Sequence, residues 1–440
     1  MILIKNAAYL VRDAERVERN VDLLVEGNKI SRIGAIGVED CPPDTMVLDG
    51  SQRAVIPGLI NAHTHLYQSM LKGRRDDLPL VEWCEEVTFP FVRKVLRAAW
   101  DKGETEIGQL WSQLGAIEMI HSGITSFIDM DMNLDGVIRA WSELGIRGTA
   151  AMTLVDQWVP EDLMLPLEKT REQTLKLIEE WHLTDPLVTV FLAPSAPFTC
   201  SESLLTWIRE QSEAHDLGIQ THVSETVWEV EQSVELTGLT PLRYLEQMGL
   251  LSRPLTAVHC VHLTEEEIEL AAQRGVVTVY NAKSNMKLGS GIAPIISLCR
   301  AGASIAMGTD GAASNDLLDP FEEMRCGLLL QKVAHTDPTV LGARDAFRFA
   351  TEGGARASRI DAGVLDEGKL ADIVLLDLSA PHILRFTDEI VAALVYCAKS
   401  SDVETVIING RIVMRDQVIQ SVDETAILTE IKRVGARYAT

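Results

Sequence analysis

The chain has 440 residues, of which 46% are hydrophobic and 24% charged, and its formal net charge at pH 7 is −24. This composition is typical of a globular protein. The excess of acidic residues argues against nucleic acid as a partner, because phosphate binding requires a basic surface. No apolar run reaches the roughly 18–20 residues of a membrane helix, so we also expect no membrane partner.

The seven cysteines are scattered along the chain and contain no C-x-x-C pair. An odd and dispersed set argues against a disulfide framework or a zinc ribbon and favours reduced thiols. Residues 1–6 read as a strand and lack the charged start and the cleavage site of a secretory leader. We therefore expect a cytoplasmic protein.

Both ends of the chain are predicted to be β-rich. Short β-branched runs at 2–4, 21–25 and 30–33 predict strands near the N-terminus, and runs at 372–377 and 406–408 predict strands near the C-terminus. Asn409-Gly410 is a strong hairpin signal. We predict one small β-sandwich domain assembled from residues 1–55 and residues 363–440, the latter ending in a helix.

The middle of the chain, residues 56–362, alternates apolar strand-like runs with amphipathic helical stretches, which is typical of parallel βα units. Eight such runs match an α/β fold of the (β/α)₈ TIM-like barrel class, and an open doubly wound sheet is the alternative. The long first crossover, from His65 to Ile124, predicts a loop over the barrel mouth. The predicted strands are 54–60, 124–130, 147–155, 188–194, 219–223, 256–261, 276–280 and 304–309.

Metal-binding residue types stand at the ends of several of these predicted strands. His63 and His65 follow the first run, His222 ends the fifth with Glu225 three residues later, and the sixth and eighth runs lead to His259 and Asp310. A barrel builds its active site from the ends of different strands. Imidazole and carboxylate groups suit zinc or ferrous iron. The pattern therefore predicts a metal-dependent hydrolase.

Four of these segments and one further segment resemble the amidohydrolase superfamily, and the resemblance covers nearly the whole chain. The chain is most similar to the branch of mononuclear-metal aminohydrolases. That branch includes S-adenosylhomocysteine/methylthioadenosine deaminases, guanine-type deaminases and triazine hydrolases. The segments are 57–65 (PGLINAHTH), 221–225 (THVSE), 257–260 (AVHC), 308–310 (GTD) and 363–371 (GVLDEGKLA).

The resemblance assigns roles by position. Glu225 would be the proton shuttle, and His259, with Asp310, would hold and orient the attacking water. No lysine ends the fourth strand, where binuclear relatives carry a carbamylated bridge, so one divalent ion is expected: Zn²⁺, with Fe²⁺ as the alternative. The implied metal ligands are His63, His65, His222 and Asp310.

The substrate pocket departs from the pattern of the adenosine-type members. Val92 stands where they hold the ribose with a glutamate, Met152 where they have an arginine, and Ser195 where they have a histidine. These replacements favour an apolar pocket and a compact heterocycle without a sugar, such as a free base, a pterin or an s-triazine. Trp83 and Gln68 are further candidates for substrate contact, with a core tryptophan and a solvated loop residue as the competing interpretations.

Three functions compete at this stage. The first is an aminohydrolase that attacks an N-heterocyclic ring carbon of a purine, pyrimidine, pterin or triazine with metal-activated water and releases ammonia, with S-adenosylhomocysteine/methylthioadenosine deaminase as the nearest family label. The second keeps the attack but expels chloride or an alkylamine, as triazine hydrolases do. The third is an inactive scaffold with the same fold. A small-molecule substrate is expected, and because relatives are often dimers or larger, a homo-oligomer is one expectation.

Overall fold

The computed structural model describes residues 1–134, 136–385, 387 and 389–438, and its centre is an eight-stranded parallel sheet. The strands follow one another in chain order through the sheet. The amide of Asp310 donates to the carbonyl of His63 at 3.0 Å, which joins the segment after the last strand to the first strand. The predicted barrel class is confirmed, and the strands are β8 (Leu59–Thr64), β9 (Ile124–Asp129), β10 (Arg147–Leu154), β11 (Val188–Pro194), β12 (Ile219–Val223), β13 (Leu255–His259), β14 (Val277–Tyr280) and β15 (Ser304–Met307).

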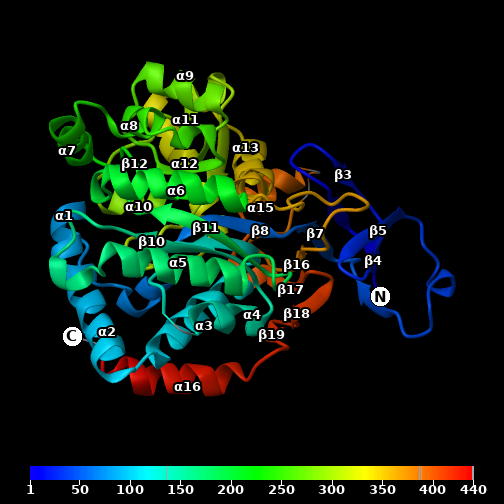
Figure 1. Cartoon of the computed structure of the whole chain (residues 1–440). Helices are drawn as coiled ribbons and strands as arrows, with labels where there is room; N and C mark the ends of the chain where they lie inside the picture. The colour runs from blue at the N-terminus through cyan, green and yellow to red at the C-terminus, as the bar shows by residue number, and fades with distance from the viewer. Residues whose placement is uncertain (135, 386, 388, 439–440) are drawn as a thin grey trace.

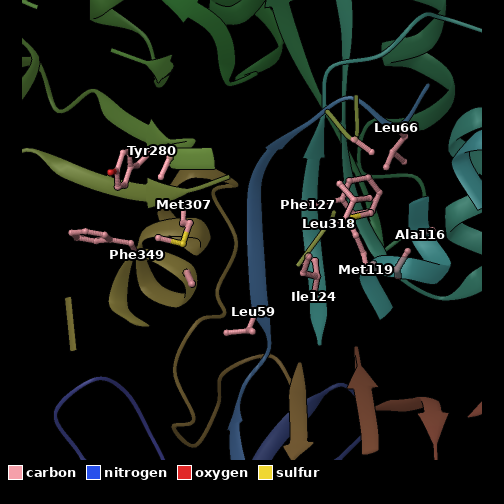
Figure 2. Close-up of a cluster of buried hydrophobic side chains, with 14 of the residues drawn as sticks. Leu59, Leu66, Ala116, Met119, Ile124, Phe127, Tyr280, Met307, Leu318 and Phe349 are labelled. Carbon is pink, nitrogen blue, oxygen red and sulfur yellow. The ribbon is translucent and has the colours of Figure 1, made fainter. Parts of the chain in front are cut away.

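Side chains of the barrel strands are buried on both faces, as expected for a parallel sheet covered by helices. Figure 2 shows the outer face, where Ile124 and Phe127 of β9 lie opposite Ala116 and Met119 of a helix. A separate cluster, including Ala62, Ile128, Ala151, Val258 and Ala306, fills the interior. The cluster combines alanines with larger side chains such as Phe191 and Met130, which together fill the interior of an eight-stranded barrel.

Helices follow most barrel strands, and their ends are marked by local sequence. In α9, for example, Thr264 accepts the amide hydrogen of Glu267 while the Glu267 side chain accepts that of Thr264, which is a capping box. The helices are α1 (Leu80–Trp83), α2 (Phe89–Lys102), α3 (Glu106–His121), α4 (Val137–Leu144), α5 (Leu167–Trp181), α6 (Glu202–His215), α7 (Val227–Thr237), α8 (Pro241–Gln247), α9 (Glu265–Arg274), α10 (Ala282–Lys287), α11 (Ile295–Arg300), α12 (Pro320–His335), α13 (Ala343–Arg348), α14 (Gly354–Ala357), α15 (Ile390–Tyr396) and α16 (Glu424–Gly435).

Eight one- or two-turn helical segments complete the connections: η1 (Val38–Asp40), η2 (Leu66–Leu71), η3 (Cys84–Thr88), η4 (Glu161–Leu163), η5 (Pro197–Thr199), η6 (Leu250–Ser252), η7 (Phe349–Gly353) and η8 (Ser400–Asp402). The first crossover is long, as expected, but it is largely helical and not a loop: η2, α1, η3 and α2 precede α3. Among the helices of the described residues, none has the length and apolar character needed to cross a bilayer.

Both chain ends build the β-rich part, as predicted. One sheet has the order β5-β4-β1-β6 and the other the order β19-β18-β17-β16-β7-β2-β3, so each strand of the C-terminal part shares a sheet with N-terminal strands. The hairpin at Asn409-Gly410 is confirmed, with φ of 51° and 73° at its two turn residues. The strands are β1 (Ile2–Ala7), β2 (Tyr9–Val11), β3 (Val17–Glu18), β4 (Val21–Glu26), β5 (Lys29–Gly34), β6 (Met46–Asp49), β7 (Arg53–Pro57), β16 (Ile373–Asp377), β17 (Val403–Ile408), β18 (Arg411–Arg415) and β19 (Val418–Ile419).

The single barrel strand predicted at 54–60 is wrong, because the run is divided between two sheets. β7 pairs antiparallel with β16 in the β-rich part, and β8 begins the barrel. Gly58 separates them: a Cβ there would lie 2.0 Å from the Thr125 hydroxyl, so only glycine permits this approach. Both halves are buried, so the apolar pattern is continuous and does not mark the change of sheet. The C-terminal helix α16 lies against α3 of the barrel (Figure 1).

A buried ion pair joins the barrel to the β-rich part. The Arg147 guanidinium, at the start of β10, donates to both carboxylate oxygens of Asp372 at 3.0 and 3.2 Å, and the two side chains are 8% and 2% exposed. Asp372 also accepts the amide hydrogen of Asn409 at 2.7 Å, and its carbonyl accepts that of Gly58 at 2.9 Å. Through its carboxylate and its carbonyl, Asp372 therefore joins the segments of Arg147, Asn409 and Gly58.

Replacing Arg147 by methionine should destabilise the protein by about 3–5 kcal/mol, because it leaves the Asp372 carboxylate buried without its partner. Equilibrium urea denaturation measures the loss. Arg433→Met, which breaks an exposed pair with Glu430 on α16, is the control and should leave the unfolding midpoint unchanged. Equal midpoints for the wild type and Arg147→Met would contradict the role given to this pair.

Candidate active site

The strand-end residues singled out in the sequence come together at one point of the barrel mouth. The ring centroid of His63 lies 4.6 Å from that of His65 and 5.0 Å from that of His222. A carboxylate oxygen of Asp310 lies 3.5 Å from Nε2 of His63 and 3.4 Å from Nε2 of His65. Two sets, His63/His65/Asp310 and His63/His222/His259, each bring their donor atoms within 4.8 Å of one another, so the cluster can hold a divalent metal.

Each of the four imidazoles is anchored through Nδ1, which leaves Nε2 for the centre. A carbonyl oxygen can only accept, so Nδ1 of His65 and of His222 must carry the proton. The Gln220 amide donates to the Ala62 carbonyl, so its oxygen faces His63. The acceptors are Gln220 Oε1 for His63 at 2.9 Å, Met130 O for His65 at 2.5 Å, Ser195 O for His222 at 2.6 Å and Asn285 Oδ1 for His259 at 2.8 Å.

The donor atoms fit a divalent cation. Nε2 of His63 is buried and has no hydrogen-bond partner among the described residues, and a buried polar atom without a partner is costly. Burial lowers the pKa of His65 to about 4, and burial together with His63 lowers the pKa of His222 well below its ordinary value. Both rings are therefore neutral at pH 7 and offer a lone pair, and three imidazoles with one carboxylate suit zinc or iron.

Asp310 is held as an anion in a strained turn. Its Oδ1 accepts the amide hydrogen of Gly311 at 2.7 Å, and its Oδ2 accepts the hydroxyl of Ser284 at 2.5 Å. Burial alone would raise the pKa of this carboxyl, but the neighbouring imidazoles of His63, His259 and His65 hold it well below the ordinary value. Asp310 and His259 have φ of 59° and 70°, the left-handed conformation that non-glycine residues adopt only uncommonly.

Glu225 lies beside this cluster, and its carboxyl has a raised pKa. Its Oε2 is 3.5 Å from Nε2 of His259, and its Oε1 accepts the Ser290 hydroxyl at 3.1 Å. Burial first, and then the Asp310 carboxylate, raise the pKa of Glu225 to about 8. Glu229 accepts the amide hydrogen of Glu225 at 2.7 Å and so holds the loop that presents it. A carboxyl whose pKa lies near neutrality can both take up and release a proton.

The sequence did not reveal several residues that orient this cluster. Asp129, the last residue of β9, and Asp131, two residues later, accept the amide hydrogens of Leu66 and Tyr67 at 2.9 and 3.2 Å, and so hold the turn after His65. A carboxylate at a predicted strand end was the criterion that selected Asp310, and it would also have selected Asp129. No such signal exists for Gln220, which lies inside a strand, or for Ser284 in α10.

All of the predicted substrate-contact residues line one cavity of about 310 Å³ together with the cluster. Trp83 is buried in the core and also faces this cavity, so the two interpretations of this residue are compatible. Its indole nitrogen has no hydrogen-bond partner among the described residues. The cavity brings together Trp83, Gln68, Met152, Ser195 and Val92 with His65, His222, Glu225, His259 and Asp310.

Comparison with known proteins places this arrangement in a family. Residues 54–413 match the amidohydrolase family. The chain is 40% identical over 414 residues to a 5-methylthioadenosine/S-adenosylhomocysteine deaminase of Thermococcus sibiricus, and the alignment covers 94% of each chain.

Two crystal structures with bound zinc share the fold. An adenosine deaminase from Xanthomonas campestris has a TM-score of 0.92 at 30% identity, covering 99% of this chain and 98% of that one. Atrazine chlorohydrolase from Arthrobacter aurescens has a TM-score of 0.92 at 26% identity, covering 99% of this chain and 100% of that one. The chain therefore belongs to the amidohydrolase family of metal-dependent hydrolases.

Proposed function

We propose that this chain is a zinc-dependent aminohydrolase that removes the amino group of an adenine nucleoside as ammonia. The observation that carries the proposal is the convergence of the His63, His65 and His222 imidazoles and the Asp310 carboxylate next to Glu225, whose pKa is raised to about 8. The relatives named as deaminases favour the nucleoside over the sugar-free ring that Val92, Met152 and Ser195 favoured.

We propose His63, His65, His222 and Asp310 as the ligands of one metal ion. The donor set suits Zn²⁺ or Fe²⁺, and the zinc in the two structural relatives favours Zn²⁺. A divalent metal held by these residues would activate water as a nucleophile at neutral pH. The seven cysteines are unpaired thiols, which supports the cytoplasm as the compartment.

Glu225 would move the protons of the reaction. It accepts one proton from the attacking water and delivers it to a ring nitrogen of the substrate, so the oxygen adds to the carbon that carries the amino group. His259 Nε2, with Nδ1 held by Asn285, accepts a hydrogen bond from the water and orients it. The second water proton, on the hydroxyl now attached to that carbon, is then transferred by Glu225 to the amino nitrogen, the carbon–nitrogen bond breaks, and ammonia leaves as a carbonyl forms.

The cavity has groups that suit the rest of a nucleoside. The indole N–H of Trp83 lacks a partner among the described residues, so an acceptor on the substrate would satisfy it. Neutral polar side chains in the lining, Gln68, Asn133 and Gln173, can bond ribose hydroxyls without a charged partner. The glutamate expected for this purpose in the adenosine-type members is replaced by Val92.

A triazine-type hydrolase that expels chloride or an alkylamine is the second candidate. The observation that favours it is the apolar lining, in which Val92, Met152 and several aromatic rings surround the entrance to the cluster. The chlorohydrolase relative has this fold at 26% identity. An inactive scaffold is disfavoured because the donor set and Glu225 are complete.

The first experiment is ammonia release by the zinc-loaded protein from adenosine, 5′-methylthioadenosine, free adenine, pterins and aminotriazines. Turnover of the adenine nucleosides is the expected result. Turnover of sugar-free rings alone would overturn the nucleoside assignment. Chloride or alkylamine release from triazines without ammonia release from any nucleoside would establish the second candidate instead.

Glu225→Gln should lower kcat by about 10²–10⁴-fold, because the amide cannot carry the proton between water and ring nitrogen. Metal content, measured on the purified variant, should stay at the wild-type level. Glu267→Gln is the matched control, since Glu267 is also a buried glutamate but caps α9 outside the cavity. If Glu225→Gln kept near wild-type turnover with metal bound, the proton-transfer role would be wrong.

Gln220→Leu should weaken zinc binding by about 10–100-fold, because His63 loses the acceptor that fixes its ring orientation. Competition with a chromogenic chelator measures the affinity without reference to turnover. Gln331→Leu removes a buried glutamine that bonds Tyr280 and the Ala293 carbonyl, so it controls for the general cost of such a change. Equal zinc affinities in both variants would contradict the proposed orientation of His63.

A further inference from the structure

Four aromatic side chains meet at the outer part of the active-site cavity. Trp158 is central: its ring centroid lies 5.9 Å from Phe89, 5.2 Å from Phe198 and 5.5 Å from Trp228. The centroids of Phe198 and Trp228 are 5.3 Å apart. We call Phe89, Trp158, Phe198 and Trp228 the aromatic box. Its members come from α2, from the segment after β10, from η5 and from α7.

The aromatic box and the metal-ligating cluster belong to one cavity, whose lining includes all four rings as well as His65, Glu225 and Asp310. Two of the rings are close in sequence to the cluster. Trp228 lies three residues after Glu225, and Phe198 lies three residues after Ser195, whose carbonyl holds His222. A substrate with its reacting carbon at the cluster can therefore extend a substituent toward the box.

The charge of the lining selects the kind of substituent. Among the described residues that line the cavity there is no lysine or arginine, whereas Glu225, Glu229 and Asp310 are all present. A carboxylate brought into this cavity would lose its hydration without gaining a cationic partner, which is costly. An apolar group instead gains contact with aromatic surface and gives up no hydrogen bond.

Hydrogen bonds before and after Trp158 hold the aromatic box in place without a ligand. The Asp156 carboxylate accepts the amide and hydroxyl hydrogens of Ser201 at 2.7 and 2.6 Å, which ties the segment before Trp158 to the start of α6. Arg93 of α2 donates to Asp162 at 2.7 and 3.2 Å, on the far side of Trp158. Trp158 itself has φ of 64°, a conformation that a bulky residue adopts only where its surroundings impose it.

Trp158 is 40% exposed although it contacts three other rings. Large aromatic surface open to water is what a binding site presents when an apolar group is to cover it. Fixed aromatic side chains also lose little conformational entropy on binding, so a small apolar group can be held effectively.

We propose that the aromatic box is the specificity site for an uncharged apolar substituent of the substrate, and that it disfavours substrates whose substituent carries a carboxylate. The proposal rests on the proposed function and goes beyond it by choosing among adenine nucleosides. A 5′-methylthio group is the kind of substituent that fits, and the amino-acid tail of S-adenosylhomocysteine is the kind that does not.

The test compares kcat/KM of the zinc-loaded protein for three nucleosides that differ only at the 5′ position. We expect kcat/KM for 5′-methylthioadenosine to be about 10-fold or more above the values for 5′-deoxyadenosine, which lacks the methylthio group, and for S-adenosylhomocysteine. A factor of this size is typical for one apolar group in a pocket that fits it. A larger or equal kcat/KM for S-adenosylhomocysteine would overturn the proposal.

Substitutions in the aromatic box test whether its rings cause the substrate preference. Trp158→Ala and Phe198→Ala should each bring the ratio of kcat/KM for 5′-methylthioadenosine over 5′-deoxyadenosine down by several-fold, toward one. Trp207→Ala is the matched control, because Trp207 lies on α6 outside the cavity, beneath the Arg171 guanidinium. It should keep the wild-type ratio, and circular dichroism verifies that all three variants are folded. A ratio unchanged in Trp158→Ala and in Phe198→Ala would contradict the proposal.

Calorimetric binding of the same three nucleosides separates this proposal from the proposed function. Absence of ammonia release together with a binding preference for 5′-methylthioadenosine that Trp158→Ala abolishes would overturn the deaminase activity and support the box. Turnover of all three at equal kcat/KM would support the activity and overturn the box. Neither turnover nor a binding preference would overturn both.

Discussion

The anchoring of imidazole Nδ1 atoms to neighbouring strands is the constraint on which this site depends. His65 bonds to the carbonyl after β9, and His222 bonds to the carbonyl after β11. These carbonyls are in place only because parallel strands bring their carboxyl ends to the same rim in a fixed stagger. Each ring is thereby turned so that Nε2 faces the centre. The barrel therefore determines the tautomer and the direction of the His65 and His222 rings.

That arrangement costs free energy of folding, because it places charged and polar groups where water is excluded. Asp310 is tolerated because Ser284 and the Gly311 amide bond its two oxygens. Glu225 has weaker support, with one hydroxyl at 3.1 Å, and burial accordingly raises its pKa to about 8. The contrast between the two carboxyls has a physical consequence: one stays anionic and suits a cation, while the other can exchange a proton near neutral pH.

The outer part of the cavity follows a different principle from the cluster. Its walls come from the first crossover and from the segments after β10, β11 and β12, which are free to vary because the barrel does not depend on them. Their aromatic side chains and the lack of a lining lysine or arginine among the described residues give an apolar entrance to a polar centre. The same barrel can therefore keep its chemistry while the entrance changes the substrate.

The sequence by itself determined the barrel class, the β-rich assembly of both chain ends and the identity of the convergent residues. This was predictable because buried parallel strands are continuous apolar runs and because ligands at strand ends share a rim. Only the tertiary structure decided where β7 leaves one sheet and β8 enters another, since burial on both sides of Gly58 erases the boundary from the pattern. It also decided which acceptors orient the rings. Gln220 and Ser284 have no local signal, because a hydrogen-bond partner is selected by distance in space and not by distance along the chain.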